Sequence, residues 1–284
     1  MRIAVTGASG RLGGQVVHLL ATETDHRVLA LSRREVGWQL DRVSSVSADY
    51  RDLPALRAAL READTLVFVS SDGDAAKVLL HHQNVVRAAA DNDVAHFVAL
   101  SSLDADLESP FCYAVTNGRT EQMLHESGCP FSVVRASIFT EFFLGLLTPA
   151  GPDGQLRLPA GDGRMSLVSR TDVGRCLAAL AVVPPTGRYH EVTGPASVDL
   201  STVAALAAQE WQAPVRYVDL PRGEYCVSMA AAAVDPWWMY AFSTMFDSIR
   251  EQRWDRVTDE VHCLTGREPL PVRDVLAGHT TRRG

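Results

Sequence analysis

Short apolar runs alternate with longer amphipathic segments through the first half of the chain. Strands are expected in five apolar runs and in one more polar run: Ile3–Thr6, Val28–Leu31, Thr65–Val69, His96–Leu100, Phe131–Arg135 and the polar Val43–Ser47. Helices are expected where apolar residues recur with a helical period: Leu12–Ala21, Pro54–Glu62, Ala76–Asp91 and Arg119–Ser127. This alternation predicts an α/β fold, in which a doubly wound parallel sheet carries helices on both faces.

The second half of the chain has a different character. Glycines in residues 151–154 and 161–163 mark turns. The elements expected beyond them are a helix capped by Thr171, a strand near Tyr189–Val192, a helix near Ser201–Gln209, a strand near Val215–Val218 and a helical region over Met229–Asp255. We therefore expect a first domain of residues 1–150, to which residues from about 165–195 return, and a smaller, mainly helical lobe of residues 196–284.

Three glycines separate the first expected strand from the first expected helix: Gly7, Gly10 and Gly13. In this context the first glycine permits a sharp turn, the second lets a pyrophosphate approach the backbone, and the third lets the helix pack closely. The start of the helix then offers N–H groups and a positive dipole end to phosphates. The pattern predicts a Rossmann-type dinucleotide site, and the alternative is a tight turn without a ligand. The other residues of the turn that we assign to the cofactor are Ser9, Arg11 and Leu12.

The second expected strand, Val28–Leu31, ends in Ser32-Arg33-Arg34. NAD-specific sheets carry an acidic residue at this place, which accepts a hydrogen bond from the ribose 2′-hydroxyl. A guanidinium instead binds a 2′-phosphate through paired hydrogen bonds. The sequence therefore predicts NADP(H), preferred over NAD(H), with Arg33 as the first candidate for the phosphate contact and Arg34 as the second. The alternative is that both arginines are solvated surface charges.

Further cofactor contacts are expected at the carboxyl ends of the neighbouring strands, because ligands bind there in sheets of this kind. Asp49 and Tyr50 follow the third strand and are candidates for contacts with adenine. Ser70 and Ser71 follow the fourth strand and are expected along the cofactor. Ser101 closes the fifth strand, where two interpretations stay open: a contact with nicotinamide or substrate, or an ordinary strand-terminal turn.

A series of short motifs runs along almost the whole chain: Val5–Gly13, Ala48–Asp52, Asn84–Ala89, Thr120–Leu124, Asp172–Arg175, Val192–Pro195 and Leu264–Pro269. With these motifs the chain resembles the NmrA-like branch of atypical short-chain dehydrogenase/reductases, and within it the bacterial NAD(P)H:quinone oxidoreductases and triphenylmethane-reductase-type enzymes. The resemblance implies a Rossmann domain, a small C-terminal lobe and a substrate cleft between them. It also implies one of two functions: reduction of a small molecule by NADPH, or cofactor sensing without turnover.

The pentapeptide from Tyr113 to Asn117 matches the Tyr-x-x-x-Lys motif of typical short-chain dehydrogenases, except that asparagine replaces lysine. In that motif the lysine lowers the pKa of the tyrosine, so that the phenol exchanges a proton while hydride moves. Asn117 brings no charge, although it can hydrogen-bond a ribose hydroxyl or a substrate carbonyl. We take Tyr113 and Asn117 as catalytic candidates, with a structural tyrosine as the alternative. Reduction of a quinone demands less, since a positioned hydride donor and an apolar pocket can suffice.

Aromatic side chains supply the candidates for the substrate pocket. Phe139, Phe142 and Phe143 follow the sixth expected strand and are expected to wall a pocket for an aromatic substrate, with core packing as the alternative. The pair Trp237-Trp238 has three interpretations: the core of the lobe, a lid over the pocket, or a contact between subunits.

The overall composition narrows the remaining possibilities. With 46% hydrophobic and 21% charged residues the chain is a globular protein, and its formal net charge of −7 argues against nucleic-acid binding. The five scattered cysteines predict neither disulfides nor zinc and fit a reducing cytoplasm. The adjacent His81 and His82 have no partners at metal-like spacing, so we expect a solvated or capped pair and no metal. No apolar stretch approaches the roughly 20 residues that span a bilayer.

We therefore expect a cytoplasmic, NADPH-dependent oxidoreductase that reduces a quinone-like or other conjugated small molecule by hydride transfer. The alternative is an NADP(H)-binding redox sensor without turnover. Neither membranes nor nucleic acids are expected as partners, and the sequence is compatible with a monomer or a homodimer.

Overall fold

The computed structural model describes residues 1–34, 36–147 and 154–280. The turn expected over residues 151–154 lies almost wholly outside them. Seven strands form one sheet in the order β3-β2-β1-β4-β5-β6-β9, and the pairs from β3 to β5 are parallel. The strands of this sheet are β1 (Arg2–Val5), β2 (Arg27–Ser32), β3 (Val43–Ser47), β4 (Thr65–Phe68), β5 (His96–Ser102), β6 (Phe131–Ala136) and β9 (Tyr189–Val192).

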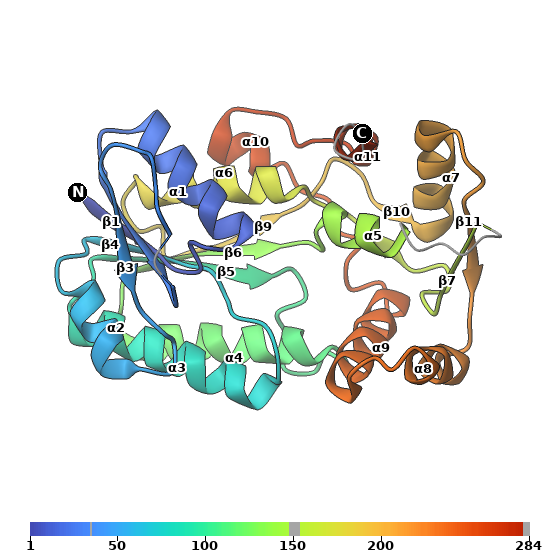
Figure 1. Ribbon diagram of the computed structural model, residues 1–284, viewed down its shortest axis with the longest axis horizontal. Coiled ribbons are helices and arrows are strands. Elements are labelled where there is room, and N and C mark those ends of the chain that lie inside the picture. Colours follow the sequence, from blue (N-terminus) through green and yellow to red (C-terminus); the bar gives the residue numbers. More distant parts are fainter. Residues whose placement is uncertain (35, 148–153, 281–284) are drawn as a thin grey trace. The chain divides into compact units, whose positions relative to one another are not determined.

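Helices cover both faces of this sheet, as Figure 1 shows. On one face lie α1 (Arg11–Glu23) and α6 (Arg170–Ala181), and on the other lie α2 (Leu53–Leu60), α3 (Ala75–Asp91) and α4 (Cys112–Ser127). The expected doubly wound, Rossmann-type α/β fold is confirmed. The order of the strands reverses beside β1, because β2 lies on one side of it and β4 on the other. A reversal of this kind creates the place where such sheets bind ligands.

The described chain divides into two compact units. Unit 1 consists of residues 1–101, 116–135 and 173–190, and unit 2 consists of residues 102–115, 136–172 and 191–284, of which residues 148–153 and 281–284 are not described. Unit 1 has its own apolar core, in which Phe68, Phe97 and Leu124 are fully buried between the sheet and its helices. The boundaries at residues 150 and 196 expected from the sequence remain a prediction.

Unit 2 combines helices with two small sheets, of which β8 with β10 is antiparallel and β7 with β11 is parallel. Its strands are β7 (Gln155–Leu158), β8 (Arg164–Met165), β10 (Val198–Asp199) and β11 (Arg216–Asp219). Its helices are α5 (Thr140–Leu147), α7 (Leu200–Trp211), α8 (Arg222–Ala231), α9 (Pro236–Arg250), α10 (Glu260–Thr265) and α11 (Val272–Thr280). The helical region expected over Met229–Asp255 is thereby confirmed. Asp235 caps α9, since its carboxylate accepts the N–H of Trp237 at 2.8 Å.

Two sequence-based expectations about helix starts are wrong. Helix α4 begins at Cys112, seven residues before the expected Arg119. The added turns contain Ala114 and Thr116, which are buried, so tertiary packing overrides the poor helix propensity of this stretch. Helix α6 begins at Arg170, which places Thr171 inside its first turn. The capping residue is Ser169, whose hydroxyl oxygen accepts the N–H of Asp172 at 2.9 Å.

Candidate functional site

The glycine turn between β1 and α1 is as tight as the sequence predicts. Gly7 has a φ of +62°, a conformation that L side chains rarely adopt. A Cβ atom on Gly13 would lie 2.3 Å from the carbonyl oxygen of Gly7, so α1 can approach the turn this closely only with glycine at that position. Gly10 lies at the start of the helix, where its N–H donates to the Gly7 carbonyl at 2.8 Å.

The N-terminus of α1 has the properties of an anion site. Among the described residues no side chain caps this helix, and its first turn contains no acidic residue. By contrast, aspartates cap α2, α3, α7 and α9. Uncapped N–H groups and the positive end of the helix dipole are what a pyrophosphate requires, so these residues fit a dinucleotide. Ser9, Gly10 and Arg11 are exposed there, whereas Leu12 is buried and can offer only its backbone.

The tip of β2 presents Arg33 and Arg34 to solvent. The hydroxyl of Ser32 donates to the carbonyl of Arg34 and thereby fixes the turn that carries both arginines. Asp49, at the neighbouring tip of β3, is bound by Arg51 through a 2.7 Å ion pair. That hydrogen bond lowers the pKa of Asp49 to about 2, and the nearby charge of Arg33 acts in the same direction. Arg33 therefore lies close to Asp49, as expected if both contact the adenosine half of one cofactor.

Sequence reasoning missed His81, Lys77 and Arg51 as members of this neighbourhood. Burial lowers the pKa of His81, and the charges of Arg51, Arg33 and Lys77 lower it further, while that of Asp49 raises it. Lys77 and His81 lie one turn apart on α3. This spacing is the only signal in the sequence, since the other members of the group lie in the segments that follow β2 and β3.

Tyr50 is held in place by hydrogen bonds at its hydroxyl and at its backbone carbonyl. Its hydroxyl donates to the carbonyl oxygen of Val69 at 2.8 Å, and burial raises its pKa. The amide of Asn84 donates to the Tyr50 carbonyl at 2.9 Å. The phenol proton is therefore committed to the β4–α3 loop, and the contact of Tyr50 with adenine stays a prediction.

The serines at the strand ends differ in their burial and in their hydrogen-bond partners. Ser70 and Ser71 are half-buried on the β4–α3 loop, and the Ser71 N–H donates to the Nε2 atom of His82 at 3.1 Å. Ser101 is buried, and its hydroxyl donates to Glu121 at 2.6 Å. Arg135 binds the same carboxylate with a 3.0 Å hydrogen bond. The contact of Ser101 with a cofactor stays a prediction; while the hydroxyl donates to Glu121, its oxygen can only accept from a cofactor group.

The two catalytic candidates lie one turn apart on α4, because that helix already begins at Cys112. Tyr113 belongs to unit 2, where its hydroxyl oxygen accepts the indole N–H of Trp237 at 3.4 Å. The two rings meet edge to face with centroids 6.1 Å apart. Asn117 is half-buried in unit 1. The structure thus gives the Tyr113 hydroxyl oxygen a neutral donor, and the catalytic roles of Tyr113 and Asn117 stay predictions.

The three phenylalanines expected to wall a pocket have different surroundings in unit 2. Phe143 is fully buried in the core of the unit. Phe142 is half-buried and packs on both Phe143 and Phe242, with ring centroids 5.4 and 5.7 Å apart. Phe139 is half-buried, with the Arg170 guanidinium 5.5 Å from its ring centroid. Phe139 and Phe142 therefore keep partly accessible rings, whereas Phe143 packs in the core.

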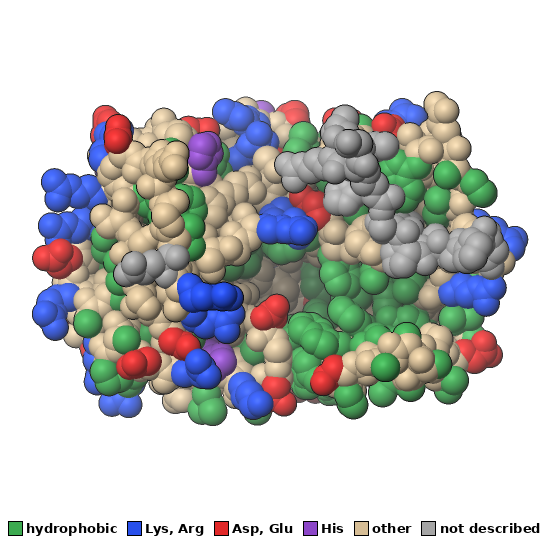
Figure 2. All heavy atoms as spheres, viewed as in Figure 1, with side chains coloured by type: hydrophobic (Ala, Val, Ile, Leu, Met, Phe, Trp, Pro, Cys, Tyr) green, Lys and Arg blue, Asp and Glu red, His purple; other side chains and the backbone are tan. Residues whose placement is uncertain are grey.

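The two tryptophans of α9 pack against different aromatic rings. Trp237 contacts Tyr113 and Tyr240, and Trp238 stacks on Phe242 with centroids 5.6 Å apart. Tyr240 is 48% exposed. Figure 2 shows hydrophobic side chains gathered on the visible face of unit 2 over α9. The pair thus continues the aromatic packing of unit 2 out to its surface.

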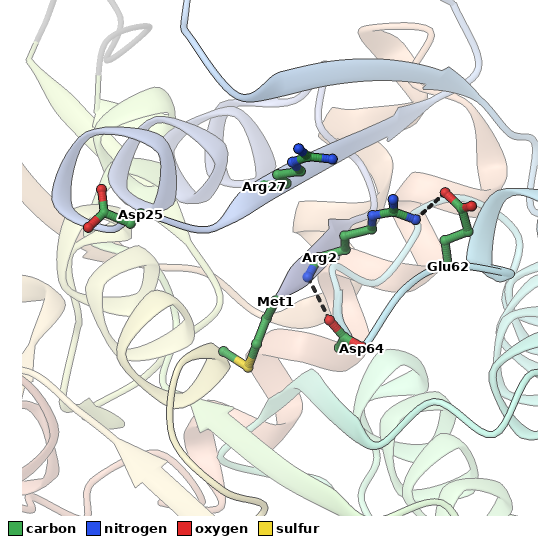
Figure 3. Close-up of a pocket in the computed structure, with 6 residues that line it drawn as sticks. All are labelled: Met1, Arg2, Asp25, Arg27, Glu62 and Asp64. Carbon is green, nitrogen blue, oxygen red and sulfur yellow. Dashed lines mark hydrogen bonds and ion pairs between the residues drawn. The ribbon is translucent and has the colours of Figure 1, made fainter.

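A separate open hollow lies at the other end of the sheet, where β1 and β2 begin. Figure 3 shows its lining of Met1, Arg2, Asp25, Arg27, Glu62 and Asp64. The Arg2 side chain forms an ion pair with Glu62, and the Arg2 backbone N–H donates to the Asp64 carboxylate at 2.7 Å. The charged side chains of the hollow are largely paired, and the glycine turn lies at the opposite end of β1. We therefore assign this hollow no part in the cofactor site.

Over residues 1–34, 36–147 and 154–280, no group of three or more histidine, cysteine or acidic side chains is placed to hold a metal ion. None of the described helices is long and apolar enough to cross a membrane.

Comparisons with known proteins agree with this geometry. Residues 7–184, which begin at the glycine turn, match the model of a protein family described as NAD(P)H-binding. Quinone oxidoreductase 2 of Escherichia coli K12 is 27% identical over 237 residues, which cover 82% of each chain. The (4-alkanoyl-5-oxo-2,5-dihydrofuran-3-yl)methyl phosphate reductase of Streptomyces griseus is 29% identical over 286 residues, covering 98% of this chain and 97% of the relative.

A solved structure shows the same architecture. The NADPH-dependent quinone oxidoreductase QOR2 of Escherichia coli, crystallised with NADPH, superposes with a TM-score of 0.88 at 22% identity. The match covers 98% of this chain and 99% of that one. At this identity the likeness concerns the fold.

Proposed function

Because the chain belongs to the NAD(P)H-binding family, as its resemblance to NmrA-like reductases predicts, we propose that it is an NADPH-dependent oxidoreductase of conjugated small molecules. The observation that carries the proposal is the uncapped N-terminus of α1 behind the glycine turn. It supplies the donors for a pyrophosphate at the place where the strand order reverses.

The preference for NADP(H) is supported by the charges at the strand tips. Arg33 and Arg34 stand where NAD-specific sheets carry an acid, and both are exposed. The carboxylate of Asp49 is bound by Arg51, which reduces its repulsion of a phosphate. A 2′-phosphate would therefore meet a net positive surface formed by Arg33, Arg34 and Lys77.

The proposed substrate class is supported by what the substrates named for the two relatives have in common. A quinone and a 5-oxo-2,5-dihydrofuran both contain a carbon–carbon double bond conjugated to a carbonyl group. When bound, NADPH supplies the hydride that such acceptors take up. The chain's own contribution is to hold the acceptor against apolar rings and to hydrogen-bond the oxygen where negative charge develops. Phe139 and Phe142 are the proposed apolar contacts, and Tyr113 and Asn117 the proposed polar ones.

The direct test follows NADPH absorbance with a panel of quinones and butenolides, together with calorimetry of NADPH and NADH binding. We expect steady oxidation of NADPH with at least one conjugated acceptor, and tighter binding of NADPH than of NADH. Tight NADPH binding without turnover on any acceptor would contradict the enzyme and favour the alternative, an NADP(H) sensor. That alternative is motivated by the replacement of the usual lysine with Asn117.

Location and assembly remain proposals as well. None of the five cysteines, all of which lie within the described residues, forms a disulfide, which fits the reducing cytoplasm that we propose for this protein. A monomer or homodimer is proposed, and light scattering of the purified protein measures which of the two occurs.

A further inference from the structure

His82 lies on α3 with only 1% of its surface exposed, yet both of its ring nitrogens are hydrogen-bonded. Its Nε2 atom lies 3.1 Å from the backbone nitrogen of Ser71 in the β4–α3 loop. Its Nδ1 atom lies 2.8 Å from Oγ1 of Thr120 on α4. The ring is further held edge-on against Phe68, with centroids 4.9 Å apart. One buried imidazole therefore links the β4–α3 loop to α4.

The partners of His82 fix its protonation. A backbone N–H can only donate, so Nε2 accepts from Ser71 and the ring proton lies on Nδ1. The Thr120 hydroxyl donates to the carbonyl oxygen of Thr116 at 2.8 Å, so its oxygen accepts from Nδ1. Burial lowers the pKa of His82 to about 3, with the charge of His81 acting in the same direction. The ring is thus neutral near pH 7, the form that this pair of contacts requires.

The β4–α3 loop is anchored at two separate points. At the first, the N–H of Val69 donates to Oγ1 of Thr6 at 2.9 Å, and the carbonyl oxygen of Val69 accepts from Tyr50 at 2.8 Å. At the second, two residues later, His82 holds the N–H of Ser71. The Ser71 hydroxyl is buried and has no partner among the residues that the structure describes. The amide, and not the side chain, therefore sets the position of residue 71.

We propose that His82 is a positioning residue of the cofactor site. Its Nε2 atom holds Ser71 where the loop meets the cofactor, and its Nδ1 atom ties that loop to the helix that carries Asn117, three residues before Thr120. The inference rests on the proposed function, because it takes Ser70 and Ser71 as cofactor contacts. It adds a specific link between the cofactor loop and the proposed catalytic helix, within one compact unit.

Two substitutions separate the two halves of this link. In His82→Gln the side-chain oxygen takes the place of Nε2 and can still accept from Ser71, while the bond to Thr120 is lost. In His82→Asn the amide nitrogen takes the place of Nδ1 and can still donate to Thr120, while Ser71 loses its acceptor. We expect the dissociation constant for NADPH to rise about tenfold in His82→Asn and less than about threefold in His82→Gln. Hydrogen exchange of the Ser71 amide should accelerate in His82→Asn alone.

Two controls distinguish positioning from general stability. His96→Asn alters another buried histidine, bonded to Ser132 at 2.9 Å, and should lower the melting temperature without changing NADPH affinity. Thr120→Val removes only the Nδ1 partner and, like His82→Gln, should leave the Ser71 exchange rate unchanged and raise the dissociation constant less than about threefold. If His82→Asn does not fold, His82→Leu, which also leaves the Ser71 N–H without its acceptor, should raise both quantities relative to Thr120→Val. Equal affinity losses in His82→Asn and His82→Gln, in step with their melting temperatures, would overturn the positioning role. A wild-type chain that binds neither nucleotide would instead refute the proposed function.

Discussion

The carbonyl oxygen of Gly7 lies 2.3 Å from the point where a Cβ atom of residue 13 would stand, so the turn and the first helix are in backbone contact. A Cβ on Gly10 would lie 3.1 Å from the same oxygen, a tight contact that is far less severe than the one at Gly13. At Gly37 no atom comes within 4 Å. The space for a Cβ atom therefore differs at these three glycines. Alanine substitutions at the three positions can distinguish an effect on stability from an effect on cofactor binding.

We expect Gly13→Ala to lower the free energy of unfolding by about 1–3 kcal/mol, because the new methyl group displaces the turn from the helix. Gly10→Ala should cost about 1 kcal/mol or less, since Gly10 has an extended backbone that alanine adopts. It should nevertheless weaken NADPH binding at least tenfold, because the methyl group occupies the side on which the pyrophosphate approaches. Urea denaturation and calorimetry measure both quantities, with Gly37→Ala as the control. Undiminished NADPH affinity in Gly10→Ala would contradict the assignment of the turn to the pyrophosphate.

The choice between the two nicotinamide cofactors is tested at the tip of β2. Arg33→Asp should raise the dissociation constant for NADPH by about thirtyfold or more and that for NADH by less than about threefold. The guanidinium is replaced by a group that repels the 2′-phosphate, which NADH lacks. Arg27→Asp is the matched control, because Arg27 is exposed at the opposite end of the same strand. Equal losses for both nucleotides in Arg33→Asp would remove Arg33 from the phosphate site.

The sequence predicted those parts of the site that depend on local geometry. The glycine turn is encoded in seven consecutive residues. Val43–Ser47 and Tyr189–Val192 occupy the expected bounds, although the first of these strands is polar. The start of α4 was not predictable, because burial of Ala114 and Thr116 outweighs weak propensity. The expectation that His81 and His82 form a solvated or capped pair is wrong for His82, whose partner Thr120 is 38 residues away. The commitment of Ser101 to Glu121 likewise depends on a contact between distant segments.

Buried histidines give the protein a defined response to acid. Burial lowers the pKa of His82 to about 3 and that of His96 to about 4, against an ordinary value of 6.5. Below pH 6.5 the unfolded chain therefore takes up protons that the folded chain does not bind, and stability falls as the pH decreases from 6.5 towards 4. We expect the melting temperature to fall through this window and to fall less steeply in His96→Gln. His18→Gln, at an exposed position on α1, should leave the slope unchanged; an identical slope in His96→Gln would contradict the argument.

The phenylalanines of unit 2 separate core from substrate contact. Phe143 is fully buried, so Phe143→Ala should lower the free energy of unfolding by about 3–5 kcal/mol. Phe139 is half-buried, so its loss should affect folding far less. If the Phe139 ring holds the acceptor, as proposed, Phe139→Ala should raise KM for a quinone about tenfold while the dissociation constant for NADPH stays unchanged. Phe139→Leu, which keeps most of the apolar surface but not the ring, should have a KM between that of the wild type and that of Phe139→Ala. An unchanged KM in Phe139→Ala would move the substrate contact away from this ring, with Phe142 as the next candidate, since it too is half-buried.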